Sequence, residues 1–115
     1  MTNTVLVSKA FQRDAKHLLK KFPTLKISIN QLIADLIKNP YLGVAYGSDI
    51  YKIRLADSSK RTGKSGGFRI LYFHLIKTED GIQILLMTIF DKSEKSTIPK
   101  AEAIKRLKQI LDEEQ

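Results

Sequence analysis

The sequence predicts an α+β fold, a small antiparallel-rich sheet with an N-terminal helical hairpin and a C-terminal helix, in one domain spanning residues 1–115. Two apolar patterns of helical spacing follow one another with almost no connecting residues, which predicts the hairpin. Three stretches of β-type composition come next, and a strong turn signal separates the last two. A third helical pattern ends the chain. The expected order of elements is therefore β-α-α-β-β-β-α.

The N-terminal part is expected to form a strand and the helical hairpin. Residues 4–7 have β-type composition, and Ser8 is a suitable N-cap because its hydroxyl can accept a hydrogen bond from the first helical turn. Pro23 ends this helix. Thr24 offers the cap of a second helix, which stops at the Asn39-Pro40 pair. The apolar faces of the two helices consist of Phe11, Ala15, Leu18, Leu19 and Phe22, and of Leu25, Ile29, Leu32, Ile33, Leu36 and Ile37.

The middle of the chain predicts a loop and then a strand. Residues 41–49 contain two glycines and a serine and are expected to form the loop, whereas residues 51–55 are expected to form the strand. Successive side chains of a strand point to opposite faces. Lys52 and Arg54 should therefore share one face of the sheet.

The C-terminal part predicts a β-hairpin followed by a helix. Residues 68–75 are apolar at almost every position, as in a strand buried on both faces, except for Arg69. The Asp80-Gly81 pair favours a tight turn, and residues 82–90 are the returning strand. Pro99 suits the first turn of a helix. The apolar face of this last helix consists of Ile104, Leu107, Ile110 and Leu111.

Composition narrows the possible functions. A net charge of +8 gives this domain a positive field that favours polyanionic partners, nucleic acid first and an acidic protein second. The chain has no cysteine and two separated histidines, so no disulfide, metal site or cofactor is expected. No apolar run approaches the roughly 18 residues of a membrane span, and no targeting segment is recognisable at the N-terminus. The protein is expected to be cytoplasmic.

Positive charge is concentrated between residues 52 and 69, which hold six cationic residues against the single acid Asp57. Three of the cations belong to predicted strands and could converge on one patch of the sheet, whereas three belong to the loop between them. The strand residues are Lys52, Arg54 and Arg69, and the loop residues are Lys60, Arg61 and Lys64. We expect the loop residues to steer and bind a nucleic acid, although a solvated basic loop is an equally simple interpretation.

Other chemical signals in the sequence are weak. Gly63-Lys64-Ser65 is not a phosphate-binding loop of nucleotide-binding proteins, because the required earlier glycine is replaced by Ser58 and a strand follows. His74 is expected to be a half-buried histidine with its hydrogen bonds satisfied, and His17 to be inert. Asp91 and Glu94 are expected to be surface charges.

Three segments together resemble the RelE/ParE toxin superfamily of bacterial type II toxin-antitoxin systems, most closely its RelE-type and HigB-like branch. These are residues 51–55, 63–72 and 85–94, and the resemblance extends over nearly the whole chain. It implies a RelE-like fold, an endoribonuclease that cuts mRNA, in many members on the ribosome, and a cognate antitoxin. It implies no metal and no small-molecule cofactor.

The resemblance also implies roles for particular residues. Lys52 and Arg54 stand where RelE-type members carry basic active-site residues, and Arg69 stands where they carry a phosphate-binding arginine. We expect Arg54 and Arg69 to stabilise charge on the scissile phosphate, Lys52 to act as general base or acid, and Lys92 to support them.

Two positions depart from the family pattern. Ser93 stands where some relatives carry a further arginine, and Phe90 where many HigB-like chains have tyrosine. Two other functions remain open from the sequence, a ParE-like inhibitor of DNA gyrase and a degenerate toxin that binds RNA without cutting it. The expected partners are an antitoxin, mRNA and the ribosome, and no membrane.

Overall fold

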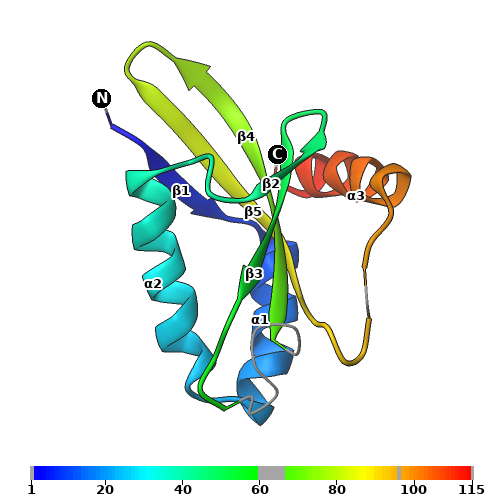
Figure 1. Ribbon diagram of the computed structural model, residues 1–115. Helices are drawn as coiled ribbons and strands as arrows, with labels where there is room; N and C mark the ends of the chain where they lie inside the picture. Colours follow the sequence, from blue (N-terminus) through cyan, green and yellow to red (C-terminus); the bar gives the residue numbers. More distant parts are fainter. Residues whose placement is uncertain (1, 60–66, 96, 115) are drawn as a thin grey trace.

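The computed structural model describes residues 2–59, 67–95 and 97–114. The observed order is β-α-α-β-β-β-β-α, so the predicted fold class and each predicted element are confirmed, with one strand added. The addition lies within residues 41–49, where the prediction of a loop was wrong. The elements are β1 (Thr4–Val7), α1 (Lys9–Lys21), α2 (Leu25–Lys38), β2 (Val44–Gly47), β3 (Ile50–Leu55), β4 (Phe68–Thr78), β5 (Gly81–Asp91) and α3 (Lys100–Glu113) (Figure 1).

The strands form one five-stranded sheet in the order β1-β5-β4-β3-β2. β1 runs parallel to β5, and the three other pairs are antiparallel. The helical hairpin and α3 lie on opposite sides of this sheet (Figure 1). Because successive side chains of β4 and β5 point to opposite faces, these strands supply both cores.

Two apolar cores result. The first lies under α1 and α2, and its largest fully buried members from the sheet are Phe68, Ile70, Tyr72, Ile84 and Leu86. The second lies under α3 and contains Ile50, Leu71, Leu85, Met87, Ile98, Ala103, Leu107 and Ile110. α3 therefore packs on the central strands through Leu107, Ile110 and Leu111 of the predicted apolar face. The prediction was wrong for Ile104, which is 37% exposed, and Ala103 is buried in its place.

The predicted helix caps differ in what they do. Ser8 caps α1 as expected, since its hydroxyl accepts a hydrogen bond from the amide of Phe11 at 2.9 Å. Thr24 is at the N-cap position of α2 but makes no side-chain cap bond. Its hydroxyl donates instead to the carboxylate of Asp57 at 2.8 Å. The second cap residue thus connects the hairpin to the segment after β3.

The turn at Asn39-Pro40 is fixed to the sheet by two buried polar side chains. The hydroxyl of Tyr72 donates to the Pro40 carbonyl at 3.0 Å and accepts from the Gly43 amide at 2.9 Å. His74 places Nε2 at 2.8 Å from the same Pro40 carbonyl. His74 is fully buried rather than half-buried, and its Nδ1 has no hydrogen-bond partner among the described residues, so the prediction of a satisfied histidine holds for one nitrogen only.

Gly43 then lets β2 approach β3. A Cβ at this position would lie 2.8 Å from the Lys52 carbonyl oxygen and 3.0 Å from the Tyr72 hydroxyl oxygen. A side chain at position 43 would therefore force these atoms apart. The backbone turns back after β2 through Gly47, Ser48 and Asp49, all at positive φ. This added strand forms one edge of the sheet beside the basic residues of β3.

Candidate nucleic-acid interface

The alternation along β3 separates its apolar and cationic side chains. Ile53 and Leu55 contact the core under the helical hairpin, and Lys52 and Arg54 therefore occupy the other face. In the pairing of β3 with β4, Arg54 is the direct partner of Arg69. The register thus places two arginines side by side on the face opposite the helical hairpin, as the sequence predicts.

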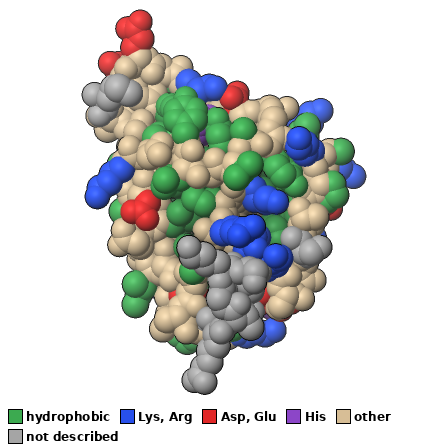
Figure 2. Space-filling view, viewed as in Figure 1, with side chains coloured by type: hydrophobic (Ala, Val, Ile, Leu, Met, Phe, Trp, Pro, Cys, Tyr) green, Lys and Arg blue, Asp and Glu red, His purple; other side chains and the backbone are tan. Residues whose placement is uncertain are grey.

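These cations line a groove of about 540 Å³ on that face. All four residues predicted to carry the chemistry contribute to it, and Lys92 enters from the segment that follows β5. No acidic side chain is among the described residues that line this groove. The lining residues are Leu42, Gly43, Val44, Tyr46, Lys52, Ile53, Arg54, Arg69 and Lys92. Figure 2 shows Lys and Arg side chains gathered near the middle of one face of the molecule, bordered by apolar ones.

The loop cations are a separate matter. Lys60, Arg61 and Lys64, for which the sequence predicts an RNA-binding role, lie outside the described residues. Their role stays a prediction.

The four cations of the groove differ in solvent exposure. Arg69 is 4% exposed, Lys52 and Lys92 are half-buried, and Arg54 is exposed. The Arg69 guanidinium donates to the Phe68 carbonyl at 3.1 Å. Burial, and then the charge of Arg54, lower the pKa of Arg69 below its ordinary value. Arginine nevertheless stays protonated in proteins, so the groove holds a fixed positive charge at its floor.

Asp57, the one acid of this segment, does not line the groove. Its buried carboxylate accepts hydrogen bonds from Thr24 Oγ1 at 2.8 Å, from Ser28 Oγ, and from the amide and hydroxyl of Ser59. Burial raises the pKa of Asp57, but these hydrogen bonds outweigh burial and the net pKa is lowered. Asp57 is thus an ionised anchor between β3 and α2 and adds no negative charge to the described lining of the groove.

Tyr46 of β2 is a groove residue that the sequence prediction missed. Its hydroxyl donates to the Ile98 carbonyl at 2.6 Å, just before α3. The Nζ atom of Lys52 lies 5.3 Å from the centre of its ring, and that of Lys100 lies 5.8 Å from it. A signal was present, because Val44–Tyr46 is a short β-type run followed by the turn residues Gly47, Ser48 and Asp49.

The turn after β5 corrects the prediction for Asp91 and gives Ser93, which stands where some relatives carry arginine, a structural role. Asp91 is 3% exposed, so the prediction of a surface charge was wrong. Its carboxylate accepts from the amide and the hydroxyl of Ser93, both at 2.9 Å, which shapes the turn that carries Lys92. Glu94 is exposed as expected and lies 3.6 Å from Lys21. His17 is exposed on α1 and lies outside the groove.

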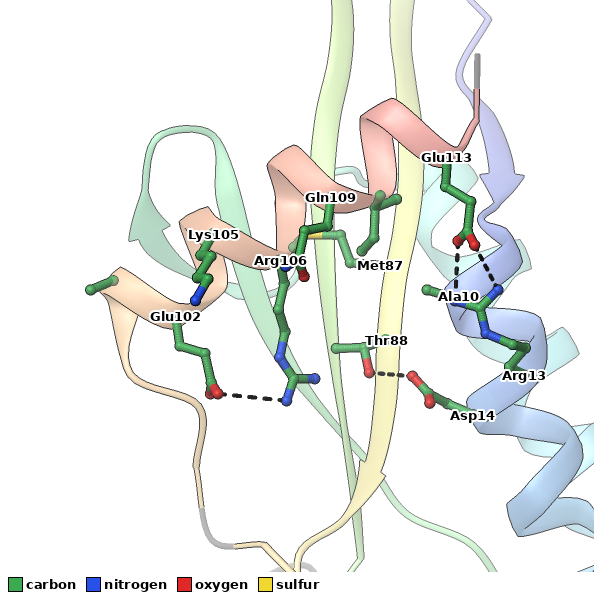
Figure 3. A pocket seen from close by; sticks show the side chains of 12 residues that line it. Ala10, Arg13, Asp14, Met87, Thr88, Glu102, Lys105, Arg106, Gln109 and Glu113 are labelled. Atoms are coloured by element: carbon green, nitrogen blue, oxygen red, sulfur yellow. Dashed lines mark hydrogen bonds and ion pairs between the residues drawn. The ribbon is translucent and has the colours of Figure 1, made fainter.

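A larger hollow of about 760 Å³ lies elsewhere, between α1, β5 and α3 (Figure 3). Its acidic and basic side chains largely pair with one another, so it offers no comparable excess of positive charge. The ion pairs are Arg13 with Glu113 at 2.9 Å and Arg106 with Glu102 at 3.8 Å. The Asp14 carboxylate accepts a hydrogen bond from the Thr88 hydroxyl at 2.6 Å.

Two further features bear on the kind of site. Within the described residues, no three His, Cys, Asp or Glu side chains are grouped so that they could hold a metal ion. No helix in the described part of the chain is long and apolar enough to cross a membrane.

The helical hairpin, the five-stranded sheet and α3 define the fold as that of the RelE-like toxins. A solved structure that shows this is that of the E. coli toxin RelE, a mutant with two arginines replaced by alanine, in the free state. It superposes with a TM-score of 0.58 over 93% of this chain and 99% of that chain, at 17% sequence identity. No family model and no curated protein matches the sequence. The resemblance drawn from the sequence is therefore confirmed for the fold.

Proposed function

We propose that this protein is the toxin of a type II toxin-antitoxin system and that it cuts mRNA on the ribosome without a metal ion. The observation that carries the proposal is the groove in which Lys52, Arg54, Arg69 and Lys92 meet on a RelE-like fold. Four cations without an acidic neighbour among the described lining residues suit the phosphates of RNA.

RNA brings its own nucleophile, the 2′-hydroxyl. In the proposed reaction the 2′-oxygen attacks the adjacent phosphorus, the bond from phosphorus to the 5′-oxygen breaks, and a cyclic phosphate and a 5′-hydroxyl result. The enzyme has to accept the proton of the 2′-hydroxyl, stabilise the charge on the phosphate, and return a proton to the 5′-oxygen.

The groove assigns these tasks by residue type and burial. Arg69 is held in the floor and Arg54 lies beside it, so both can place guanidinium donors on the phosphate oxygens. No His, Asp or Glu is among the described lining residues, and proton transfer therefore falls to Lys52, the half-buried lysine on β3. Lys92 adds positive charge from the segment after β5.

The test is expression of variants in a bacterial host without an antitoxin, with growth and the 5′ ends of ribosome-bound mRNA as readouts. Lys52→Met and Arg69→Ala should each lower cleavage by roughly 10²- to 10⁴-fold, the range for positioned proton transfer and charge stabilisation. Lys26→Met, which removes an exposed lysine of α2 outside the groove, is the matched control and should keep full activity.

Folding of each variant is checked by circular dichroism and thermal unfolding. Growth arrest and cleavage at the wild-type level in folded Lys52→Met and Arg69→Ala proteins would overturn the proposal. Inhibition of purified DNA gyrase without RNA cleavage would support the ParE-like function instead. Harmless overexpression of the wild-type chain would support a degenerate RNA-binding toxin.

The proposed antitoxin is a small acidic protein. A net charge of +8 favours a negatively charged partner both in encounter rate and in specificity. An adjacent reading frame that encodes such a protein, and that abolishes growth arrest when co-expressed, would be the expected finding.

A further inference from the structure

Tyr46 is the aromatic side chain among the described residues that line the basic groove. It comes from β2, the edge strand, whereas the cations come from β3, β4 and the segment after β5. The mechanism described above gives it no task. A ring in this position nevertheless meets the requirement that single-stranded RNA places on a protein, which is a flat apolar surface next to positive charge.

The ring is held in place before any ligand arrives. Its hydroxyl donates to the carbonyl of Ile98, a residue that is 1% exposed and belongs to the core under α3. The ring also packs partly against that core. Because the hydroxyl is occupied by a backbone acceptor, Tyr46 is suited to contact through its face rather than to proton transfer.

Two lysine ammonium groups lie close to the Tyr46 ring. Lys52 Nζ lies 5.3 Å from the ring centre and Lys100 Nζ 5.8 Å from it, both within the range of a cation-π contact. Such a contact at a partly exposed site is weak, and an RNA phosphate is a stronger partner for an ammonium group. When RNA binds, Lys100 can turn to a phosphate and Lys52 to the oxygen atoms at the scissile bond, and a ring face is then left open.

We propose that Tyr46 is the platform on which one unpaired base of the RNA stacks, and that Lys100 contacts a neighbouring phosphate. This inference rests on the proposed function and adds to it a determinant of substrate binding. It predicts a preference for single-stranded over duplex RNA, because a base in a duplex cannot present its face to a protein ring.

The test measures binding of a short fluorescein-labelled single-stranded RNA by anisotropy. Tyr46→Leu keeps an apolar side chain but removes the aromatic face, and it should weaken binding by roughly 5- to 150-fold, the range for loss of one stacked base. Tyr46→Phe removes the hydrogen bond to Ile98 and keeps the ring, and as the conservative variant it should restore most of the affinity. Tyr41→Leu is the control, since Tyr41 is 55% exposed and does not line the groove.

A second set of probes locates the stacked base. RNAs that each carry one abasic nucleotide are compared on wild type and on Tyr46→Leu. One abasic RNA should bind wild type and Tyr46→Leu equally. This RNA lacks the base that stacks on Tyr46, so loss of the ring costs it no affinity. Lys100→Gln should weaken binding of every RNA in the set by a similar factor, as expected for a phosphate contact.

Three results would overturn the inference. These are an affinity of Tyr46→Leu within about twofold of wild type, an equal loss in Tyr46→Phe, and an abasic series in which no position cancels the effect of Tyr46→Leu. The second result would mean that Tyr46 only fixes the segment before α3. If Arg54→Gln weakens RNA binding and Tyr46→Leu does not, the proposed function stands without the stacking platform. If the wild type neither binds nor cuts RNA, both fall together.

Discussion

Replacement of Arg54 by glutamine should reduce the salt dependence of RNA binding by a defined amount. Arg54 is the exposed cation of the groove, so its loss leaves the cores intact. Binding of a phosphate by a lysine or arginine releases a counterion, and for single strands each such contact contributes about −0.7 to the slope of log K against log salt concentration.

The groove fixes the size of the effect. With the four cations that line it, the groove contributes a slope of about −2.8, and the Arg54→Gln protein should lose about 0.7 of this. Between about 50 and 200 mM salt, that contribution weakens wild-type binding about 50-fold and binding by the variant about 20-fold. The absolute slope of the whole protein includes any contact outside the groove, but the difference between the two proteins does not.

Anisotropy titrations with the same labelled RNA at several salt concentrations measure both slopes. Lys26→Gln removes the same charge from the exposed surface of α2 and should leave the slope unchanged. An equal change in slope for the two variants would show that RNA responds to net charge and not to this groove, and it would refute the reasoning.

Two further predictions concern the residues that position the groove. Asp57→Ala removes the acceptor of the hydrogen bonds from α2 and from the segment after β3, and should lower the free energy of unfolding at pH 7 by about 1–3 kcal/mol. Because the pKa of Asp57 is lowered in the folded protein, its contribution to stability is complete above the ordinary carboxyl pKa of about 3.9 and is lost as the pH falls through the folded value. Urea unfolding should therefore give free energies of unfolding for wild type and Asp57→Ala that converge in acid. Gly43→Ala places a methyl group 2.8 Å from the Lys52 carbonyl oxygen and should cost about 1–3 kcal/mol while weakening RNA binding. Unchanged stability of this variant would contradict the assigned close approach of β2 to β3.

The part of the cationic site that depends on local strand geometry could be predicted from the sequence. The pleat of a strand has a period of two whatever surrounds it, so Lys52 and Arg54 could be placed on one face from the sequence alone. Arg69 could be matched to them because it interrupts an apolar strand. The direct pairing of Arg54 with Arg69 also needs the register of β3 and β4, which depends on residues far apart in the chain.

What the sequence did not reveal depends on such distant contacts. β2 is four residues long, and its position relies on Gly43 fitting against Tyr72 of β4. The short length of β2 and the glycines at positions 43 and 47 favoured a loop, and Tyr46 was missed with it. Asp91 has the composition of a surface turn, yet the fold buries it and its carboxylate organises the turn that follows. Burial of an acid in a turn is a property of the packing around it.

The pairing of Arg54 with Arg69 also places two like charges side by side on the sheet. Like charges directly opposite each other in a sheet are unfavourable, and the lowered pKa of Arg69 includes the charge of Arg54. Under the proposed function, RNA in the groove would relieve this repulsion and would bind only the native sheet, because β3, β4 and the segment after β5 meet only when the strands are paired. By mass action, occupancy of the groove and thermal stability rise together, so the melting temperature reports on substrate binding even when no bond is cut.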